Sequence, residues 1–307
     1  MLDGVILLWF LLSALSVLFV AVDIRRTPEA AVMKWGFVIV TAFTGPVGAF
    51  LYVLGCREPL PGTHERYVAA KWRQVLGSTL HCVAGDGLGI LVAAVVTRSL
   101  GLPMGLDLAA EYLSGFLFGW TVFQALFMKD MAGGSYGRSL RDTLLPEFLS
   151  MNGVMAGMVA VMVPAMAHVT GADTPGSPRF WFVMSTALLT GLVVAYPINW
   201  WLVGQGLKHG MMTVRPGGTA PPLSGGLWAA GRALHEDSGH GTGTAVAGHR
   251  IRAHQHRPTP DVAHSHGQST GMAHQHHPSR GLPGTLAVAA AVTTGLLVLV
   301  LVVTGVL

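Results

Sequence analysis

The sequence predicts an all-α fold, a polytopic membrane helix bundle with about seven transmembrane helices. The chain of 307 residues is 51% hydrophobic and only 11% charged, whereas soluble domains carry about 25% charged residues. A helix needs about 20 apolar residues to cross the hydrocarbon core of a bilayer. Seven runs meet this need, and they cover residues 4–22, 35–55, 76–97, 107–128, 146–169, 180–203 and 283–307.

The first two runs predict a helical hairpin joined by residues 23–29. We expect the first run to be a retained helix and not a signal peptide, because no positive charge precedes it and no plausible cleavage site follows it. The second run contains Gly45-Pro46, a step that is expected to kink a single transmembrane helix in mid-membrane.

Charge and composition predict four parts of the chain. Residues 1–71 are expected to form the N-terminal transmembrane hairpin with a basic loop, residues 72–212 a transmembrane core, and residues 283–307 a C-terminal anchor. Residues 213–282 are rich in Gly, Pro, Ser, Thr and His, and such a composition predicts a disordered loop.

The net charge of +4 comes from Lys and Arg in the loops, so we interpret it as topology information and expect the bilayer, not a nucleic acid, as partner. The distribution of these charges favours a cytoplasmic N-terminus, a cytoplasmic His-rich loop and a C-terminus outside. Lys208 is expected to mark a cytoplasmic helix exit. The sequence predicts no oligomeric state.

The first candidate site lies in the third run, where His81, Cys82 and Asp86 occur together. Cys82 and Asp86 stand four residues apart and share a helix face, and Gly85-x-x-x-Gly89 predicts the close approach of a neighbouring helix. An ionisable group inside a membrane is costly and indicates function, and imidazole, thiolate and carboxylate all bind transition metals. The alternative is that Asp86 pairs with an arginine while His81 and Cys82 fill the interior.

The second candidate site is a helix face that carries Glu147 and a row of methionines, with Gly and Ala on the opposite face. The row consists of Met151, Met155, Met158, Met162 and Met166. Thioethers are soft ligands suited to Cu(I), and a row of weak sites could pass an ion along. The alternative is ordinary packing by methionine, with Glu147 near a helix start stabilised by the helix dipole.

The third candidate is the His-rich loop, which holds ten of the fourteen histidines. The residues that we single out as metal ligands are His254, His256, His264, His266, His274, His276 and His277. Paired imidazoles on a flexible chain bind Zn(II), Ni(II) or Cu(II). The alternative is a solvated linker. The two cysteines, Cys56 and Cys82, are too few for a structural zinc site or a disulfide framework.

Several of these motifs are similar to those of a known family. The stretch from Glu147 to Asn152, the pattern Tyr196-Pro197-Ile198-Asn199-Trp200-Trp201 followed by Lys208-His209-Gly210-Met211, and the block from His81 to Gly89 resemble bacterial membrane proteins of the domain of unknown function 4396 family over about residues 72–212. The resemblance implies a multi-pass protein of the bacterial inner (plasma) membrane with no assigned activity.

We expect no enzyme, because phosphate-binding loops, nucleophile elbows and HExxH motifs are missing from the sequence. The leading hypothesis is a protein that handles or transports a soft or borderline metal ion such as Cu(I) or Zn(II), and no other cofactor is expected. The alternative is a non-catalytic membrane assembly or partner-binding protein with the His-rich loop as a tether. A haem protein would need His81 and His168 at facing depths.

Overall fold

The computed structural model describes residues 2–129, 134–208, 210–211 and 282–307, and this part of the chain is helical, with turns and no strand. Five helices are long and apolar enough to cross a membrane, and they are Leu2–Arg26, Lys71–Ser99, Tyr136–His168, Pro178–Gly204 and Gly284–Val303. The predicted all-α membrane architecture is therefore found. The predicted number of seven transmembrane helices is not.

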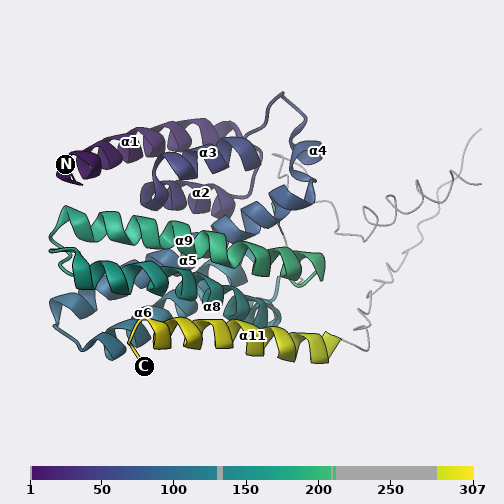
Figure 1. Ribbon diagram of the computed structural model, residues 1–307. Helices are drawn as coiled ribbons and strands as arrows, with labels where there is room; N and C mark the ends of the chain where they lie inside the picture. The colour runs from purple at the N-terminus through teal and green to yellow at the C-terminus, as the bar shows by residue number, and fades with distance from the viewer. Residues whose placement is uncertain (1, 130–133, 209, 212–281) are drawn as a thin grey trace, which may run out of the picture. The chain divides into compact units, whose positions relative to one another are not determined.

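The helices follow the chain in a simple order (Figure 1). They are α1 (Leu2–Asp23), η1 (Ile24–Arg26), α2 (Ala31–Thr44), α3 (Pro46–Gly55), α4 (His64–Val68), α5 (Lys71–Ser99), α6 (Met104–Phe118), the π-helical turn η2 (Gly119–Gln124), α7 (Ala125–Met128), α8 (Tyr136–His168), α9 (Pro178–Gly204) and α11 (Leu282–Val303). The predicted run 107–128 is thus interrupted by a π-helical turn.

The long helices run between two faces of the bundle. At one, the Asp3 face, the start of α1 meets the start of α9, and Arg179 Nη2 lies 3.0 Å from Asp3 Oδ1. Arg98, at the end of α5, also lies at this face and contacts Asp107 near the start of α6. At the other, the Lys71 face, α1 ends, α5 and α8 begin, and α9 ends with Gly204 close to the Lys71 ammonium.

Residues 35–55 form two short helices that reverse direction, so the prediction of one kinked transmembrane helix is wrong. α2 ends at Thr44 and α3 starts at Pro46. Between them, Gly45 has a φ of 57°, which lies in the left-handed region that glycine adopts without steric cost. The turn lies against Ser13, in the middle of α1. Near the end of α3, Tyr52 donates to Asp23 Oδ2 over 2.8 Å, so α2 and α3 begin and end at the Lys71 face (Figure 1).

This re-entrant hairpin, formed by α2 and α3, changes which loops share a face of the bundle. Ten Lys and Arg residues lie at the Lys71 face, and they are Arg25, Arg26, Lys34, Arg57, Arg66, Lys71, Arg73, Lys129, Arg138 and Arg141. Within the described ranges, Arg98 and Arg179 lie at the Asp3 face. Because cytoplasmic loops carry the excess of Lys and Arg, we expect the Lys71 face to be cytoplasmic and Asp3 to lie on the opposite side, contrary to the predicted cytoplasmic N-terminus.

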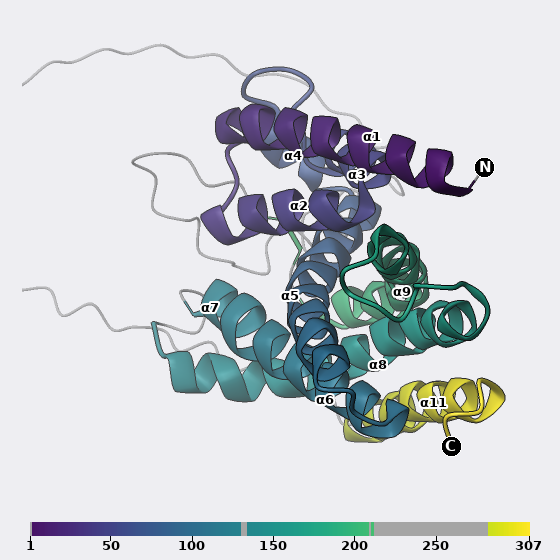
Figure 2. The same cartoon turned by 90° about the vertical axis from the view of Figure 1, so that its left-hand side faces the viewer.

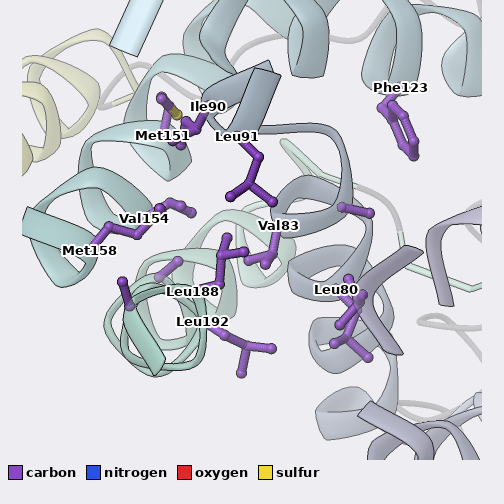
Figure 3. Packing of buried hydrophobic residues seen from close by; sticks show 14 of the residues in the cluster. Leu80, Val83, Ile90, Leu91, Phe123, Met151, Val154, Met158, Leu188 and Leu192 are labelled. Carbon is purple, nitrogen blue, oxygen red and sulfur yellow. The ribbon is translucent and has the colours of Figure 1, made fainter. Parts of the chain in front are cut away.

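α5 lies at the centre of the packing. Figure 2 shows α2 between α1 and α5, while α6, α8 and α9 also contact α5. Buried side chains such as Leu80, Leu91 and Leu188 fill the interior (Figure 3). This position places the polar residues of α5 where side chains from several helices can reach them.

The predicted close approach at Gly85-x-x-x-Gly89 is confirmed. A Cβ atom added to Gly85 would lie 3.0 Å from Gly119 Cα, and one added to Gly89 would lie 2.8 Å from Gly115 Cα. Close backbone contact through small residues is a common way for helices to associate in lipid. Here it brings η2 next to the polar face of α5.

The re-entrant hairpin can be tested by labelling single cysteines in a chain that lacks Cys56 and Cys82. We expect a membrane-impermeant maleimide to reach Arg25→Cys and Leu60→Cys from the same side, since both exposed positions lie at the Lys71 face. The exposed position Leu100→Cys is the control and should react from the other side. Labelling of Arg25→Cys and Leu60→Cys from opposite sides would instead support a single transmembrane helix over 35–55.

Candidate functional site

A buried ammonium lies at the centre of the candidate site. Lys208 Nζ donates to Cys82 Sγ over 2.8 Å and to Glu147 Oε2 over 3.0 Å. Cys82 Sγ also donates to Glu147 Oε2 over 3.4 Å. The side chains of Lys208 and Glu147 are fully buried, so a cation, a carboxylate and a thiol meet away from water. We call these residues, together with Asp86, the Lys208 cluster.

α5 and α8 carry the other members of this cluster at depth. Cys82 stands eleven residues after the first residue of α5, about 16 Å along the helix. Glu147 also stands eleven residues after the first residue of its helix, because α8 begins at Tyr136 and continues through Pro146. Glu147 is therefore not near a helix start, and the interpretation by the helix dipole is wrong.

Lys208 reaches the cluster because the chain folds back after α9. Leu207 N donates to Leu202 O over 2.9 Å, which tightens the turn after Gly204. Beyond Lys208, the carbonyl of Met211 accepts from Gln74 Nε2 over 3.0 Å, and the Met211 side chain lies against Gly77. Met211 therefore packs on the first turns of α5, and Lys208 points inward instead of marking a helix exit.

Asp86 lies beside Glu147 in the same buried cluster. A Cβ atom on Gly119 would overlap Asp86 Oδ1 and would lie 3.0 Å from Glu147 Oε1, so the two carboxyl groups border one small space under η2. Among the described residues, no hydrogen-bond donor faces either oxygen of Asp86. Two buried carboxylates cannot both stay ionised beside one ammonium, so the site requires a proton or a second cation.

Lys208 lies outside the membrane-spanning helices, and its charge is favoured by its neighbours. Burial lowers the pKa of the Lys208 ammonium, but Cys82 and Glu147 raise it by more, so this pKa lies above its ordinary value. The neighbours of Lys208 therefore favour its ammonium form in this site.

His81 does not join this cluster, although it precedes Cys82. Its Nε2 lies 3.1 Å from the carbonyl oxygen of Phe123, and its ring packs against Phe123 and Phe127. His168 ends α8 at the Asp3 face, so it does not lie at the same depth as His81. This arrangement gives no support to a pair of axial haem ligands.

The methionine row lies in the hydrophobic core and not at the lipid surface. Met151, Met155, Met158 and Met162 are all buried there, and Figure 3 labels Met151 and Met158 among Ile90, Val154 and Leu188. Met166 is half-buried, and its sulfur accepts from Arg98 Nη2 over 3.1 Å. The buried methionines of the row therefore pack among other hydrophobic side chains, as the alternative of ordinary packing predicts. Only Met151, the first residue of the row, is one helical turn from Glu147.

Other intramembrane polar groups connect helices. Asn199 Nδ2 on α9 donates to Ser150 Oγ on α8 over 3.0 Å. Asn152 accepts from Tyr112 over 2.7 Å and donates to Thr293 on α11 over 3.3 Å. The last helix, predicted as a plain anchor, thus contributes a buried hydroxyl group.

The histidines that the sequence singles out in the loop cannot be placed. His254, His256, His264, His266, His274, His276 and His277 lie outside the described residues. The structure thus brings together Cys82, Asp86 and Glu147 from the predicted ligands and adds Lys208. The sequence carries no clear signal for a buried Lys208, since a lysine that follows an apolar helix usually extends to the interface.

Comparison with known proteins gives one match. Residues 71–208 match a family model described as Domain of unknown function (DUF4396). No curated protein and no solved structure matches the chain. The matched region begins at the start of α5 and ends at Lys208, so it contains every member of the Lys208 cluster.

Removal of the ammonium tests the pairing in this cluster. Lys208→Met leaves Glu147 buried without its cation, and we expect it to lower the free energy of unfolding by about 3–5 kcal/mol. Adding Glu147→Gln to that variant removes the unpaired charge and should restore part of the loss. Thermal unfolding in detergent measures both. Equal unfolding temperatures for the wild type, Lys208→Met and the double variant would show that the buried pair does not form.

Proposed function

We propose a function from the site itself, because the DUF4396 family, to which this chain belongs through residues 71–208, is described without an activity. In this proposal the protein binds a soft or borderline metal ion, Cu(I) or Zn(II), and carries it across the membrane. One observation supports this most. The Lys208 ammonium is held by a sulfur and a carboxylate oxygen, so an internal cation occupies a position with the donors that a metal ion would use.

The donor set suits a borderline metal ion. Zn(II) binds thiolate sulfur and carboxylate oxygen, and Cys82, Asp86 and Glu147 provide both kinds. With all three deprotonated, their negative charges equal the sum of one divalent ion and the Lys208 ammonium. Buried charges are tolerated when they are paired in this way, so the charge balance favours Zn(II) over Cu(I) in this site.

Exchange of cations gives a physical basis for release. A metal ion that binds Cys82, Asp86 and Glu147 requires the thiolate and both carboxylates, so its binding expels two protons, the thiol proton and the one held by the carboxyl pair, and displaces Lys208 from Cys82 and Glu147. When the ammonium returns between these two groups, it competes with the metal ion for the same donors. Each site in a transport path must release its ion, and Lys208 supplies the competing charge.

A second function has an observation of its own. The Lys208 ammonium lies between Cys82 and Glu147 and donates to both, which is the arrangement expected of a non-catalytic assembly or partner-binding protein whose polar groups hold helices together. In that case Asp86 contributes only a buried carboxyl group beside Glu147, and its replacement should leave the protein intact or make it more stable.

The variant Asp86→Asn separates the two functions. In proteoliposomes that contain a Zn(II)-sensitive dye, we expect the wild type to admit Zn(II) and Asp86→Asn to slow this flux by about tenfold or more, since even outer-shell changes cost 10–100-fold in metal affinity. Cu(I), kept reduced, is measured in parallel.

Glu111→Gln is the matched control, because Glu111 is also a fully buried carboxyl group whose oxygens face no described hydrogen-bond donor. It lies on α6 and outside the Lys208 cluster, so its flux should stay at the wild-type level. Equal flux in Asp86→Asn and the wild type, or no flux above protein-free vesicles in the wild type, would exclude transport of these ions through the cluster and favour the assembly function.

A further inference from the structure

A second group of metal-ligating side chains lies at the Lys71 face, where the re-entrant hairpin begins and ends. Ligand atoms of Glu29, Cys56 and His64 all lie within 4.8 Å of one another, and all three residues are buried. They come from the turn before α2, the end of α3 and the start of α4. No motif in the sequence connects them, because the three positions are far apart in the chain.

The surrounding backbone holds these residues in place. Cys56 N donates to Tyr52 O over 2.9 Å, and Glu29 N donates to Thr27 O over 2.9 Å. The Tyr52 hydroxyl lies 3.0 Å from Thr27 Oγ1, so the segments before Glu29 and Cys56 are joined. On the third side, Glu58 Oε1 accepts from His64 N over 3.0 Å, which closes the loop between Cys56 and His64.

The donor atoms face one another within this frame. Glu29 Oε2 accepts from Ala30 N over 3.2 Å, while Oε1 lies 3.9 Å from His64 Nε2. In a tetrahedral zinc site with bonds of 2.0–2.3 Å, neighbouring ligand atoms are separated by about 3.5 Å. The donors therefore need to move by only a fraction of an ångström to about 1 Å to close on an ion.

We propose that Glu29, Cys56 and His64 form a binding site for a borderline divalent metal ion of the Zn(II) class, separate from the Lys208 cluster. One imidazole, one thiolate and one carboxylate match the ligand preference of Zn(II). The ion gains the Cys56 thiolate, the Glu29 carboxylate and a neutral His64, and the Cys56 thiol proton is released. The resulting charge is zero, which suits a buried site, whereas Cu(I) would leave one negative charge.

One cysteine is enough for this site, because a histidine and a glutamate complete the ligand set. Three protein ligands leave a fourth tetrahedral position for a water or another donor. The site would fix the ends of α2 and α3 to α4. This inference does not depend on metal transport through Cys82.

Cobalt(II) in the full chain tests the site, because thiolate–cobalt charge transfer gives an absorption band that histidines alone cannot give. In Cys82→Ser, Cys56 is the one remaining cysteine of the chain, and the His-rich loop adds no thiol. We expect a charge-transfer band that saturates at about one equivalent of Co(II) and is displaced by Zn(II), as expected for four-coordinate sites.

Two ligand variants and one control complete this experiment. In the Cys82→Ser chain, His64→Ala and Glu29→Gln should each weaken Co(II) binding by about tenfold or more, whereas His81→Ala, which replaces a buried histidine outside the trio, should not. Absence of the band in Cys82→Ser, or binding that neither ligand variant weakens, would overturn the proposal.

A reciprocal comparison keeps Cys82 in place and guards against a folding defect in Cys82→Ser. The band should decrease from the wild type to Cys56→Ser, and Zn(II) should raise the unfolding temperature of the wild type by more than that of Cys56→Ser. An equal band and an equal temperature shift in these two chains would also overturn the proposal. A negative result of the Asp86→Asn flux experiment would not affect Co(II) binding at Glu29, Cys56 and His64. The two proposals, metal transport through the Lys208 cluster and this second metal site, are therefore tested independently.

Discussion

The pairing of a buried ammonium is the constraint on which the core of this bundle depends. A cation held away from water is tolerated only with a close counter-charge and further hydrogen bonds. Lys208 obtains these from Cys82 on α5 and Glu147 on α8, so the chain must turn back after α9 and lie on α5. One ammonium therefore joins three segments that are far apart in the sequence.

The two candidate sites are connected through α2. This helix begins beside Glu29 and passes α5 at Gly36, where a Cβ atom would lie 3.7 Å from His81 Nδ1. His81 in turn precedes Cys82. A shift of the re-entrant hairpin would therefore displace His81, which is adjacent in sequence to Cys82 of the Lys208 cluster, because close-packed interiors transmit displacement.

The sequence was sufficient to predict the membrane class, the long helices and Cys82, Asp86 and Glu147 as candidate residues, because apolar length and costly buried charges leave few alternatives. The meeting of these three side chains in one cluster is a finding of the structure. The reversal at Gly45 was not predictable in this way, because hydropathy measures length and not direction. Lys208 was misplaced because a lysine after a helix usually extends to the interface. Glu29, Cys56 and His64 share no spacing, so only the folded chain brings them together.

The re-entrant hairpin also bears on how the protein enters the membrane during synthesis. Since α2 and α3 return to the face from which they start, Asp23 and Lys71 lie at the same face, and the hairpin between them enters the bundle only as far as Ser13, in the middle of α1. Arg25, Arg26 and Arg57 then never have to be translocated through the hydrocarbon core, a passage that is costly for each guanidinium. Of the helices before α5, only α1 then has to cross the bilayer. The hairpin can insert afterwards from the face at which it begins and ends.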